Sequence, residues 1–292
     1  MRKFEYFEPC TIEEAVALLA EHGDRAKVLA GGTDLLVAMK RREITPDFIV
    51  NIKAIPHMGF IKDEDGWLSI GALTAIRAVE TSPLVREKAP VLAQAASQLA
   101  SLQIRNLATL GGNLCRASPC AETAPALLGL GAEVRLNGTE GERVLPLEEF
   151  FTGPGQTALH RDEVMTEIRV PVSPSRTGGV YLKHGIRRMM DIAIVNVAVV
   201  VTLDGRSDVV GEIKIALGSV APTPIRVRRA EELLRGQPVG EGLLDRAAQM
   251  ASEEASPISD VRGSAQYRRE MIKVMTRQAI NQALVVANRQ HN

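Results

Sequence analysis

The apolar positions of the first fifty residues recur first at helical spacing and then at strand-like spacing. Thr11 and Glu14 form the Ser/Thr-x-x-Glu pattern of a capping box, and apolar residues follow at helical spacing until Gly23. The next segments have the patterns of a strand, a helix and a second strand, at residues 27–30, 35–42 and 47–52. The chain is therefore expected to open with a small α/β unit.

The middle of the chain combines strand patterns with one long helical stretch. Ser82 followed by Pro83 marks a helix entry, and helical spacing continues to about Leu102. Strands are predicted on both sides of this stretch, at residues 67–74, 132–138, 142–147 and 163–171. This region is predicted to form a second α/β unit.

Residues 172–179, with the sequence VSPSRTGG, are the most linker-like segment, because Pro, Ser and Gly cluster there between two strand patterns. Strand patterns follow at residues 180–185, 192–203 and 212–220, and helical patterns run from about Arg228 to the end. Strands followed by helices predict an α+β domain with its helices on one face of a sheet. The expected division is a domain at 1–175, with subdomains of about 1–57 and 58–175, and a domain at 176–292.

The composition of the 292 residues is that of a globular protein, with 45% hydrophobic residues. Thirty-five basic residues balance thirty-five acidic ones, which argues against nucleic acid or an anionic membrane as the main partner. The longest apolar run, residues 192–203, is too short for a transmembrane span, and early acidic residues leave no apolar core for an export signal. Three cysteines form no disulfide framework, so a reducing, cytoplasmic location is expected.

Two glycine pairs are the first candidates for chemistry. Gly31–Gly32 lies at the predicted strand-to-helix turn beside Thr33, and Gly111–Gly112 lies just after Thr109. Paired glycines are either simple turn residues or a way to present amide N–H groups to phosphate oxygens. On the second alternative, amides from both pairs could bind one diphosphate. The sequence has neither a G-x-G-x-x-G after a strand nor a P-loop, so Rossmann and P-loop sites are not supported.

Longer motifs around these glycines resemble a known family. KVLAGGTDLLVAMK at residues 27–40 and NLATLGGNLCRASPCAETAPALLGLGAEV at residues 106–134 are similar to the FAD-binding medium subunit of the molybdenum hydroxylases. That family includes xanthine dehydrogenase, aldehyde oxidoreductase and carbon monoxide dehydrogenase. The resemblance continues through EVMTEIRVP and YLKHGIRRMMDIAIVNVAVVV and covers most of the chain. It implies an α+β fold with a two-part PCMH-type, vanillyl-alcohol-oxidase-like FAD-binding domain, followed by a CO dehydrogenase flavoprotein C-terminal α+β domain.

The resemblance also implies which residues contact FAD. A first phosphate loop would contain Val28, Leu29, Ala30, Gly31, Gly32, Thr33, Asp34 and Leu35, and a second would contain Thr109, Gly111, Gly112 and Asn113. Further contacts are implied at Leu99, Ile104, Ala108, Glu122, Val164, Met165 and Lys183. The apolar members of this set would equally serve as ordinary core residues. No residue of the chain is expected to be catalytic or to bind a metal.

Charged positions near the implied site have both functional and structural interpretations. Glu122 stands where the family usually has aspartate and is either a cofactor ligand or a solvated acid near a helix start. Lys183 would stabilise negative charge on the reduced flavin, although a strand lysine is usually only solvated. Arg187, Arg188 and Asp191 form either a charged loop near the flavin edge or a solvated turn.

The resemblance implies an FAD-containing electron-transfer subunit. Electrons would arrive from [2Fe–2S] clusters on a small subunit, after substrate oxidation on a large molybdopterin subunit, and leave to NAD, a quinone or oxygen. The three cysteines cannot build an iron–sulfur quartet within this chain, and the five histidines lack metal-ligand spacing. Two alternatives are a self-contained flavin oxidoreductase on the same fold and a non-catalytic assembly module.

Overall fold

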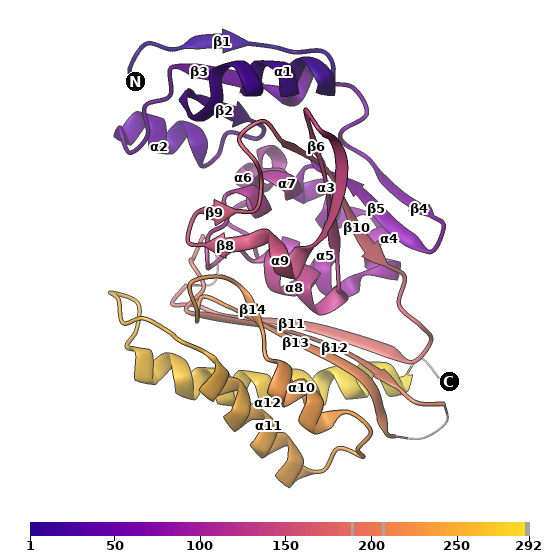
Figure 1. Ribbon diagram of the computed structural model, residues 1–292. Helices are drawn as coiled ribbons and strands as arrows, with labels where there is room; N and C mark the ends of the chain where they lie inside the picture. Colours follow the sequence, from indigo (N-terminus) through magenta and orange to yellow (C-terminus); the bar gives the residue numbers. More distant parts are fainter. Residues whose placement is uncertain (188–189, 206–207, 290–292) are drawn as a thin grey trace.

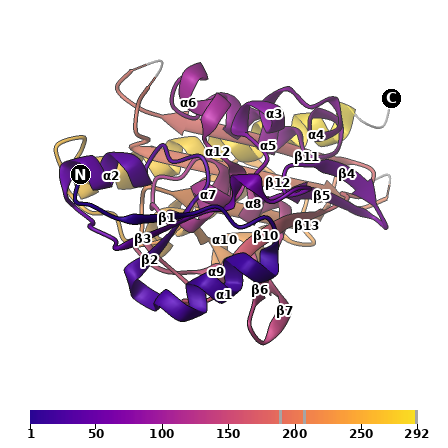
Figure 2. The same cartoon turned by 90° about the horizontal axis from the view of Figure 1, so that it is seen from above.

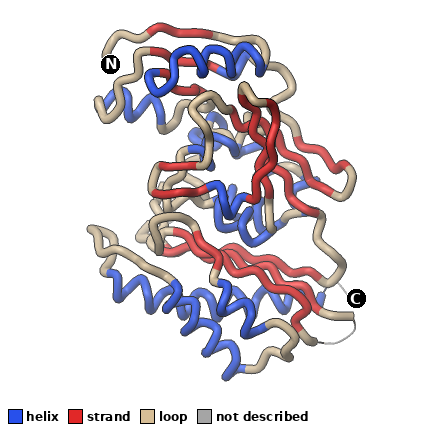
Figure 3. The backbone as a smooth tube through the Cα atoms, in the orientation of Figure 1, coloured by secondary structure: helices blue, strands red, loops and turns tan. Residues whose placement is uncertain are grey.

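The structure is a computed structural model that describes residues 1–187, 190–205 and 208–289. Figure 1 shows three parts stacked one upon another: a small α/β unit, a mixed middle part, and a sheet covered by helices. Each part has one main sheet, the middle part has an additional two-stranded hairpin, and helices of the middle part lie between the five-stranded and the four-stranded sheet (Figure 3).

The N-terminal unit is a three-stranded parallel sheet with the strand order β1-β3-β2. Its elements are β1 (Glu5–Phe7), α1 (Ile12–His22), β2 (Ala26–Leu29), α2 (Leu35–Arg41) and β3 (Phe48–Asn51), with 3₁₀ turns at Gly23–Arg25 and Ile52–Ala54. Val50 packs with α1 and its neighbour Ile49 packs with Met39 of α2. Because adjacent strand residues face opposite sides, the two helices cover opposite faces of the sheet (Figure 2).

The helix predicted after Thr11 is confirmed together with its start and stop signals. The amide of Glu14 donates a hydrogen bond of 3.1 Å to Thr11 Oγ1, and Gly23 ends the helix with a φ of +53°. The Glu14 carboxylate accepts from the amide of Cys10 at 2.7 Å, one residue before the usual capping-box partner.

The middle part is a five-stranded antiparallel sheet with the order β4-β5-β10-β6-β7 and seven short helices. The strands of this sheet are β4 (Ile61–Glu64), β5 (Trp67–Gly71), β6 (Glu133–Gly138), β7 (Gly141–Pro146) and β10 (Val164–Pro171). The helices are α3 (Ile76–Thr81), α4 (Pro83–Lys88), α5 (Pro90–Ser97), α6 (Leu102–Leu107), α7 (Leu110–Cys115), α8 (Thr123–Leu130) and α9 (Leu147–Phe150). A small hairpin of β8 (Phe151–Gly153) and β9 (Gln156–Thr157) follows α9.

The C-terminal part is a four-stranded antiparallel sheet with helices on one face. Its elements are β11 (Thr177–His184), β12 (Val195–Leu203), β13 (Val210–Gly218), β14 (Ile225–Arg226), α10 (Arg228–Leu234), α11 (Glu241–Glu254) and α12 (Ala265–Arg289). Helix α12 packs against β11 and β12, as Figure 1 shows. Helices α5 and α8 of the middle part pack on the other face, where Ala198 and Val200 join the core of that part. A strand covered on both faces explains the continuous apolar sequence of β12.

Two predicted boundaries are wrong. The linker interpretation of residues 172–179 extends too far, because β11 already begins at Thr177. The stretch after Ser82 is largely helical, as predicted, but it ends at Ser97 and not near Leu102, where the separate helix α6 begins after its cap Ser101. Within the stretch, Ala89 has a φ of −140° and separates α4 from α5, which Pro90 starts. Among the described residues, the structure has no helix with the length and apolar character needed to cross a membrane.

Candidate functional site

The turn between β2 and α2 presents a row of free backbone donors. Gly32 has a φ of +73°, a left-handed conformation that favours glycine, and its carbonyl accepts from the amide of Leu36 at 3.1 Å. Within the described part of the chain, no group accepts a hydrogen bond from the amides of Gly31, Gly32, Thr33 or Asp34. Successive unpaired N–H groups in a turn form a concave site that suits an anion.

The two glycine motifs meet in space. A Cβ added at Gly31 would lie 2.2 Å from the carbonyl oxygen of Leu107 and 2.9 Å from Cα of Ala108. Only glycine therefore allows the first loop to rest on the segment that leads into Thr109. Helices α6 and α7, which flank this segment, lie directly below the β2–α2 turn in Figure 1.

The second glycine pair does not offer free amides, in contrast to the expectation that both pairs present N–H groups to one diphosphate. The amide of Gly111 donates to the carbonyl of Ala72 at 2.9 Å, and the amide of Gly112 donates to Thr109 Oγ1 at 3.1 Å. A Cβ at Gly111 would lie 2.7 Å from Cβ of Ala72. Gly111 is needed for the close approach of α7 to the end of β5, and Thr109 is the N-cap of α7.

Asn113 is oriented by a residue that the sequence analysis missed. Thr123, at the start of α8 and fully buried, donates through Oγ1 to Oδ1 of Asn113 at 2.6 Å. This contact fixes the side-chain amide and leaves its NH₂ group without an acceptor among the described residues. A hydroxyl within the apolar sequence TAPALLGL was the only available signal.

Glu122 and Lys183, both predicted near the flavin, form a buried ion pair. Lys183 Nζ lies 2.8 Å from Glu122 Oε1, with 9% and 11% of the two side chains exposed. Burial raises the pKa of the Glu122 carboxyl, and the ammonium of Lys183 opposes that shift. Neither residue is the solvated surface charge of the simpler alternative.

The predicted apolar positions are core residues in the structure. Leu99, Ala108 and Met165 are buried in the core of the middle part, with Ile104 partly buried beside it. Val164 packs instead with the N-terminal unit. In β10, Met165 pairs with Leu136 of β6, and the register of the two strands shifts directly after this pair. Packing accounts for these side chains, and their contact with FAD stays a prediction.

The charged loop after Lys183 closes on itself. The amide of Arg187 donates to Asp191 Oδ2 at 2.7 Å and lowers the pKa of that carboxyl. The guanidinium of Arg187 is 71% exposed, whereas the side chain of Asp191 is 8% exposed. The predicted position Arg188 lies outside the described residues.

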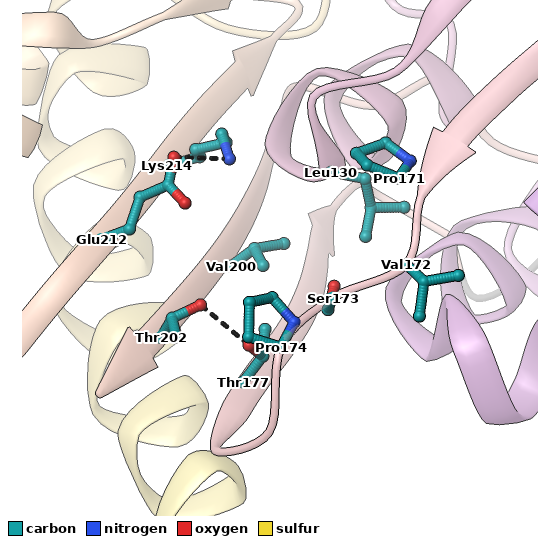
Figure 4. A pocket seen from close by; sticks show the side chains of 10 residues that line it. All are labelled: Leu130, Pro171, Val172, Ser173, Pro174, Thr177, Val200, Thr202, Glu212 and Lys214. Atoms are coloured by element: carbon teal, nitrogen blue, oxygen red, sulfur yellow. Dashed lines mark hydrogen bonds and ion pairs between the residues drawn. The ribbon is translucent and has the colours of Figure 1, made fainter. Parts of the chain in front are cut away.

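Two cavities of the structure lie away from the glycine motifs. One of about 120 Å³ lies where the segment after β10 crosses the C-terminal sheet (Figure 4), lined by Leu130, Pro171, Val172, Ser173, Pro174, Thr177, Val200, Thr202, Glu212 and Lys214. Four of its polar side chains are already paired, Thr177 with Thr202 at 2.8 Å and Glu212 with Lys214 at 2.7 Å. A groove of about 390 Å³ lies between the end of β1 and α1. Neither contains a residue of the glycine motifs, and the described residues hold no His, Cys, Asp and Glu group suited to a metal.

Comparison with known proteins matches two consecutive regions of the chain to family models. Residues 2–173 match the family described as the FAD binding domain in molybdopterin dehydrogenase, and residues 180–283 match the CO dehydrogenase flavoprotein C-terminal domain. The carbon monoxide dehydrogenase medium chain of Hydrogenophaga pseudoflava is 37% identical over 96% of this chain and 97% of its own. A putative xanthine dehydrogenase FAD-binding subunit of Escherichia coli K12 is 32% identical over 97% and 96%.

Solved structures agree with these relatives. Carbon monoxide dehydrogenase from Hydrogenophaga pseudoflava, in a form lacking the Mo-pyranopterin moiety of the molybdenum cofactor, superposes with a TM-score of 0.94 over 97% of this chain and 98% of that one, at 37% identity. Quinoline 2-oxidoreductase from Pseudomonas putida 86 reaches a TM-score of 0.90 over the same shares at 28% identity.

Proposed function

The chain belongs to the family of FAD-binding medium subunits of molybdenum hydroxylases, and from this premise we propose that it passes electrons through FAD to a terminal acceptor. The domains would be residues 1–175, which bind FAD, and residues 176–292. Its free cysteines are consistent with the cytoplasm, where we place it.

The row of unpaired amides from Gly31 to Asp34 is the observation that carries this proposal. A diphosphate has the acceptor oxygens that these donors lack, and the close contact of Gly31 with Leu107 sets the turn against the second glycine motif. Thr33 and the free NH₂ group of Asn113 would add side-chain hydrogen bonds, with the Thr109 hydroxyl beside them. The residues present therefore fit the phosphate part of FAD.

The protein's share of the chemistry is to bind and orient the flavin and to set the charge around it. When bound, FAD supplies a centre that accepts one electron at a time and can release two together. The donor we propose is a pair of [2Fe–2S] clusters on a small partner subunit, fed by a large subunit that holds molybdopterin. The acceptor would be NAD, a quinone or oxygen.

An exposed apolar surface supports the need for a partner. We call it the edge patch, and it consists of Ile186, Met190, Ile192, Ile258, Val261 and Tyr267. Six of the fourteen exposed large apolar side chains among the described residues belong to it, although they come from only two short segments. Such grouping is typical of protein interaction sites.

The two segments of the edge patch are joined by hydrogen bonds. Arg268 donates to the carbonyl of Ile194 at 2.5 Å and to Asp260 Oδ1 at 2.8 Å. His184 Nε2 lies 2.8 Å from the hydroxyl of Tyr267. These bonds join the residues that flank the first segment to the second, and the first segment is the loop that Lys183 contacts.

The test is purification of the native protein with its companions, followed by determination of chains, flavin, iron and molybdenum in one sample. We expect FAD, iron and molybdenum to arrive with two further chains. A lone yellow chain that reduces its flavin with a small organic substrate would overturn the proposal in favour of a self-contained oxidoreductase. A colourless chain that takes up no FAD would overturn it in favour of an assembly module.

A further inference from the structure

The ammonium of Lys183 is fully occupied by contacts within the protein. Its Nζ donates to Glu122 Oε1 at 2.8 Å, to the carbonyl of Gln98 at 3.0 Å and to the carbonyl of Asp191 at 2.8 Å. An ammonium has three N–H donors, so none is left over. Lys183 therefore has no N–H left to donate to the flavin, although its charge could still act on a nearby ring.

The three acceptors belong to three separate segments. Glu122 precedes α8, Gln98 follows α5, and Asp191 lies in the loop between β11 and β12. We propose, on the basis of the proposed function, that Lys183 is a positioning residue that holds this loop and the end of α5 against Glu122. We call the three hydrogen bonds of Lys183 the latch. Leu99, next to Gln98, and Glu122 are both predicted FAD contacts, so the latch would fix their relative positions in the cofactor site.

Lys183 contacts the β11–β12 loop, which is also braced by internal contacts and at its base. Its carboxylate Asp191 binds the amide of Arg187, and a Cβ at Gly185 would lie 2.3 Å from Asp191 Oδ2. At its base, the amide of Ile194 donates to the carbonyl of His184 at 2.8 Å. The base is joined to α12 through Arg268, whereas the Lys183 contact joins the loop to α5 and Glu122. Loss of that contact would free the loop on the side of the cofactor site.

Substitutions in the ion pair can distinguish the effect of the hydrogen bonds of Lys183 from the effect of its charge. Glu122→Gln keeps an oxygen that accepts from Lys183 and leaves the ammonium without its counter-charge. Lys183→Met removes all three hydrogen bonds and leaves a buried carboxylate unpaired, a severe change for a folded protein. The double variant Glu122→Gln/Lys183→Met removes the same bonds without an unpaired charge, so it tests the latch even where the single variant fails to fold.

Hydrogen exchange of the full-length, flavin-free chain tests the latch. In Lys183→Met and in the double variant, we expect the amides of Arg187 and Ile194 to exchange at least about tenfold faster than in the native chain. Glu122→Gln should keep native protection. Lys214→Met is the matched control, because among the described residues Lys214 forms an ion pair with Glu212 of its own strand and with no other side chain, so the substitution should leave this loop unchanged.

Unchanged exchange in the double variant would overturn the latch, as would equal acceleration in Lys214→Met. This result is decided without flavin and so does not depend on the proposed function. In the flavin-loaded protein, Glu122→Gln should raise the flavin potential, since an unpaired cation favours the reduced flavin, and the double variant should return it toward the native value. An unchanged potential in Glu122→Gln would overturn the position of the pair beside the flavin.

Discussion

At the scale of single residues, Gly31 shows how a missing side chain sets the position of a loop. We predict that Gly31→Ala lowers the free energy of unfolding by about 1–3 kcal/mol, because the new methyl group would overlap the backbone at Leu107. The same displacement should weaken FAD binding at least about tenfold, since it moves the free amides. Urea unfolding and flavin titration measure the two effects.

The matched control for this substitution is Gly242→Ala in α11. A Cβ there meets nothing within 4 Å, and alanine is the better helix former, so we expect a gain of about 0.5–1 kcal/mol and native FAD affinity. Equal FAD affinity in Gly31→Ala and the native chain would show that the β2–α2 turn does not bind the cofactor.

The cysteines give a second prediction at this scale. Burial raises the pKa of the Cys115 thiol to about 12, and it raises that of Cys120 as well, whereas Cys10 is exposed. Only the thiolate reacts, so at about pH 8 Cys115 should stay protonated and unlabelled while Cys10 reacts first. Mass spectrometry after a timed thiol-labelling reaction reads this order. All three should react in urea, and native labelling of Cys115 as fast as Cys10 would contradict the prediction.

At the scale of elements, the contact between β11 and α12 determines how the C-terminal helix seats on its sheet. A Cβ at Gly178 would lie 2.0 Å from the carbonyl oxygen of Ala283 and 2.5 Å from the amide nitrogen of Ala287. Because backbone atoms cannot rotate away, Gly178→Ala should shift α12 and cost at least about 1–3 kcal/mol in the free energy of unfolding.

Gly129→Ala on α8 provides the comparison from the opposite face of the same sheet. Its Cβ would make an ordinary contact of 3.5 Å with Val200, so its effect should be neutral or stabilising. Differential scanning calorimetry of both variants measures the difference. A native melting temperature in Gly178→Ala would mean that the helix and strand can separate without loss.

Gly178 also illustrates what the sequence could and could not predict. Its neighbours Pro174, Ser175 and Gly179 have the composition of a linker, and only the distant Ala283 explains why a strand needs glycine there. The capping box at Thr11 and the β2–α2 turn were predictable because their signals are local in sequence. The core strands β10, β12 and β13 were predictable from their apolar patterns for the same reason.

In the candidate site, too, features with local signals were predictable and features that depend on distant residues were not. Its glycine motifs could be located from sequence, but the use of the Gly111 amide depends on Ala72, which comes from another element. The ion pair joins Glu122 and Lys183 across 61 residues. No local pattern encodes such a pairing, so two positions predicted one by one became a single buried unit only in the fold.

At the scale of the whole molecule, the proposed cofactor site and the edge patch would meet at the β11–β12 loop. Lys183, a predicted FAD contact, donates to the loop at the carbonyl of Asp191, and Ile186, Met190 and Ile192 of the same loop are exposed. An electron-transfer subunit needs its donor to approach the flavin closely. Exposed apolar side chains next to the proposed site would suit such an approach.

This arrangement predicts that the edge patch can be damaged without harm to the flavin. Val261 is 96% exposed, so Val261→Glu should change the free energy of unfolding by no more than about 0.5 kcal/mol and leave FAD affinity native. A carboxylate buried without a partner in an apolar interface should weaken binding of the iron–sulfur subunit at least about tenfold. Affinity measurement between the purified chains detects the loss.

Val144→Glu is the control, since Val144 is an exposed apolar residue on β7 and not part of the edge patch. It should leave subunit binding native. If Val261→Glu binds the iron–sulfur subunit as tightly as Val144→Glu does, the partner docks on another surface. In that case electrons would have to reach the flavin from a side other than the β11–β12 loop.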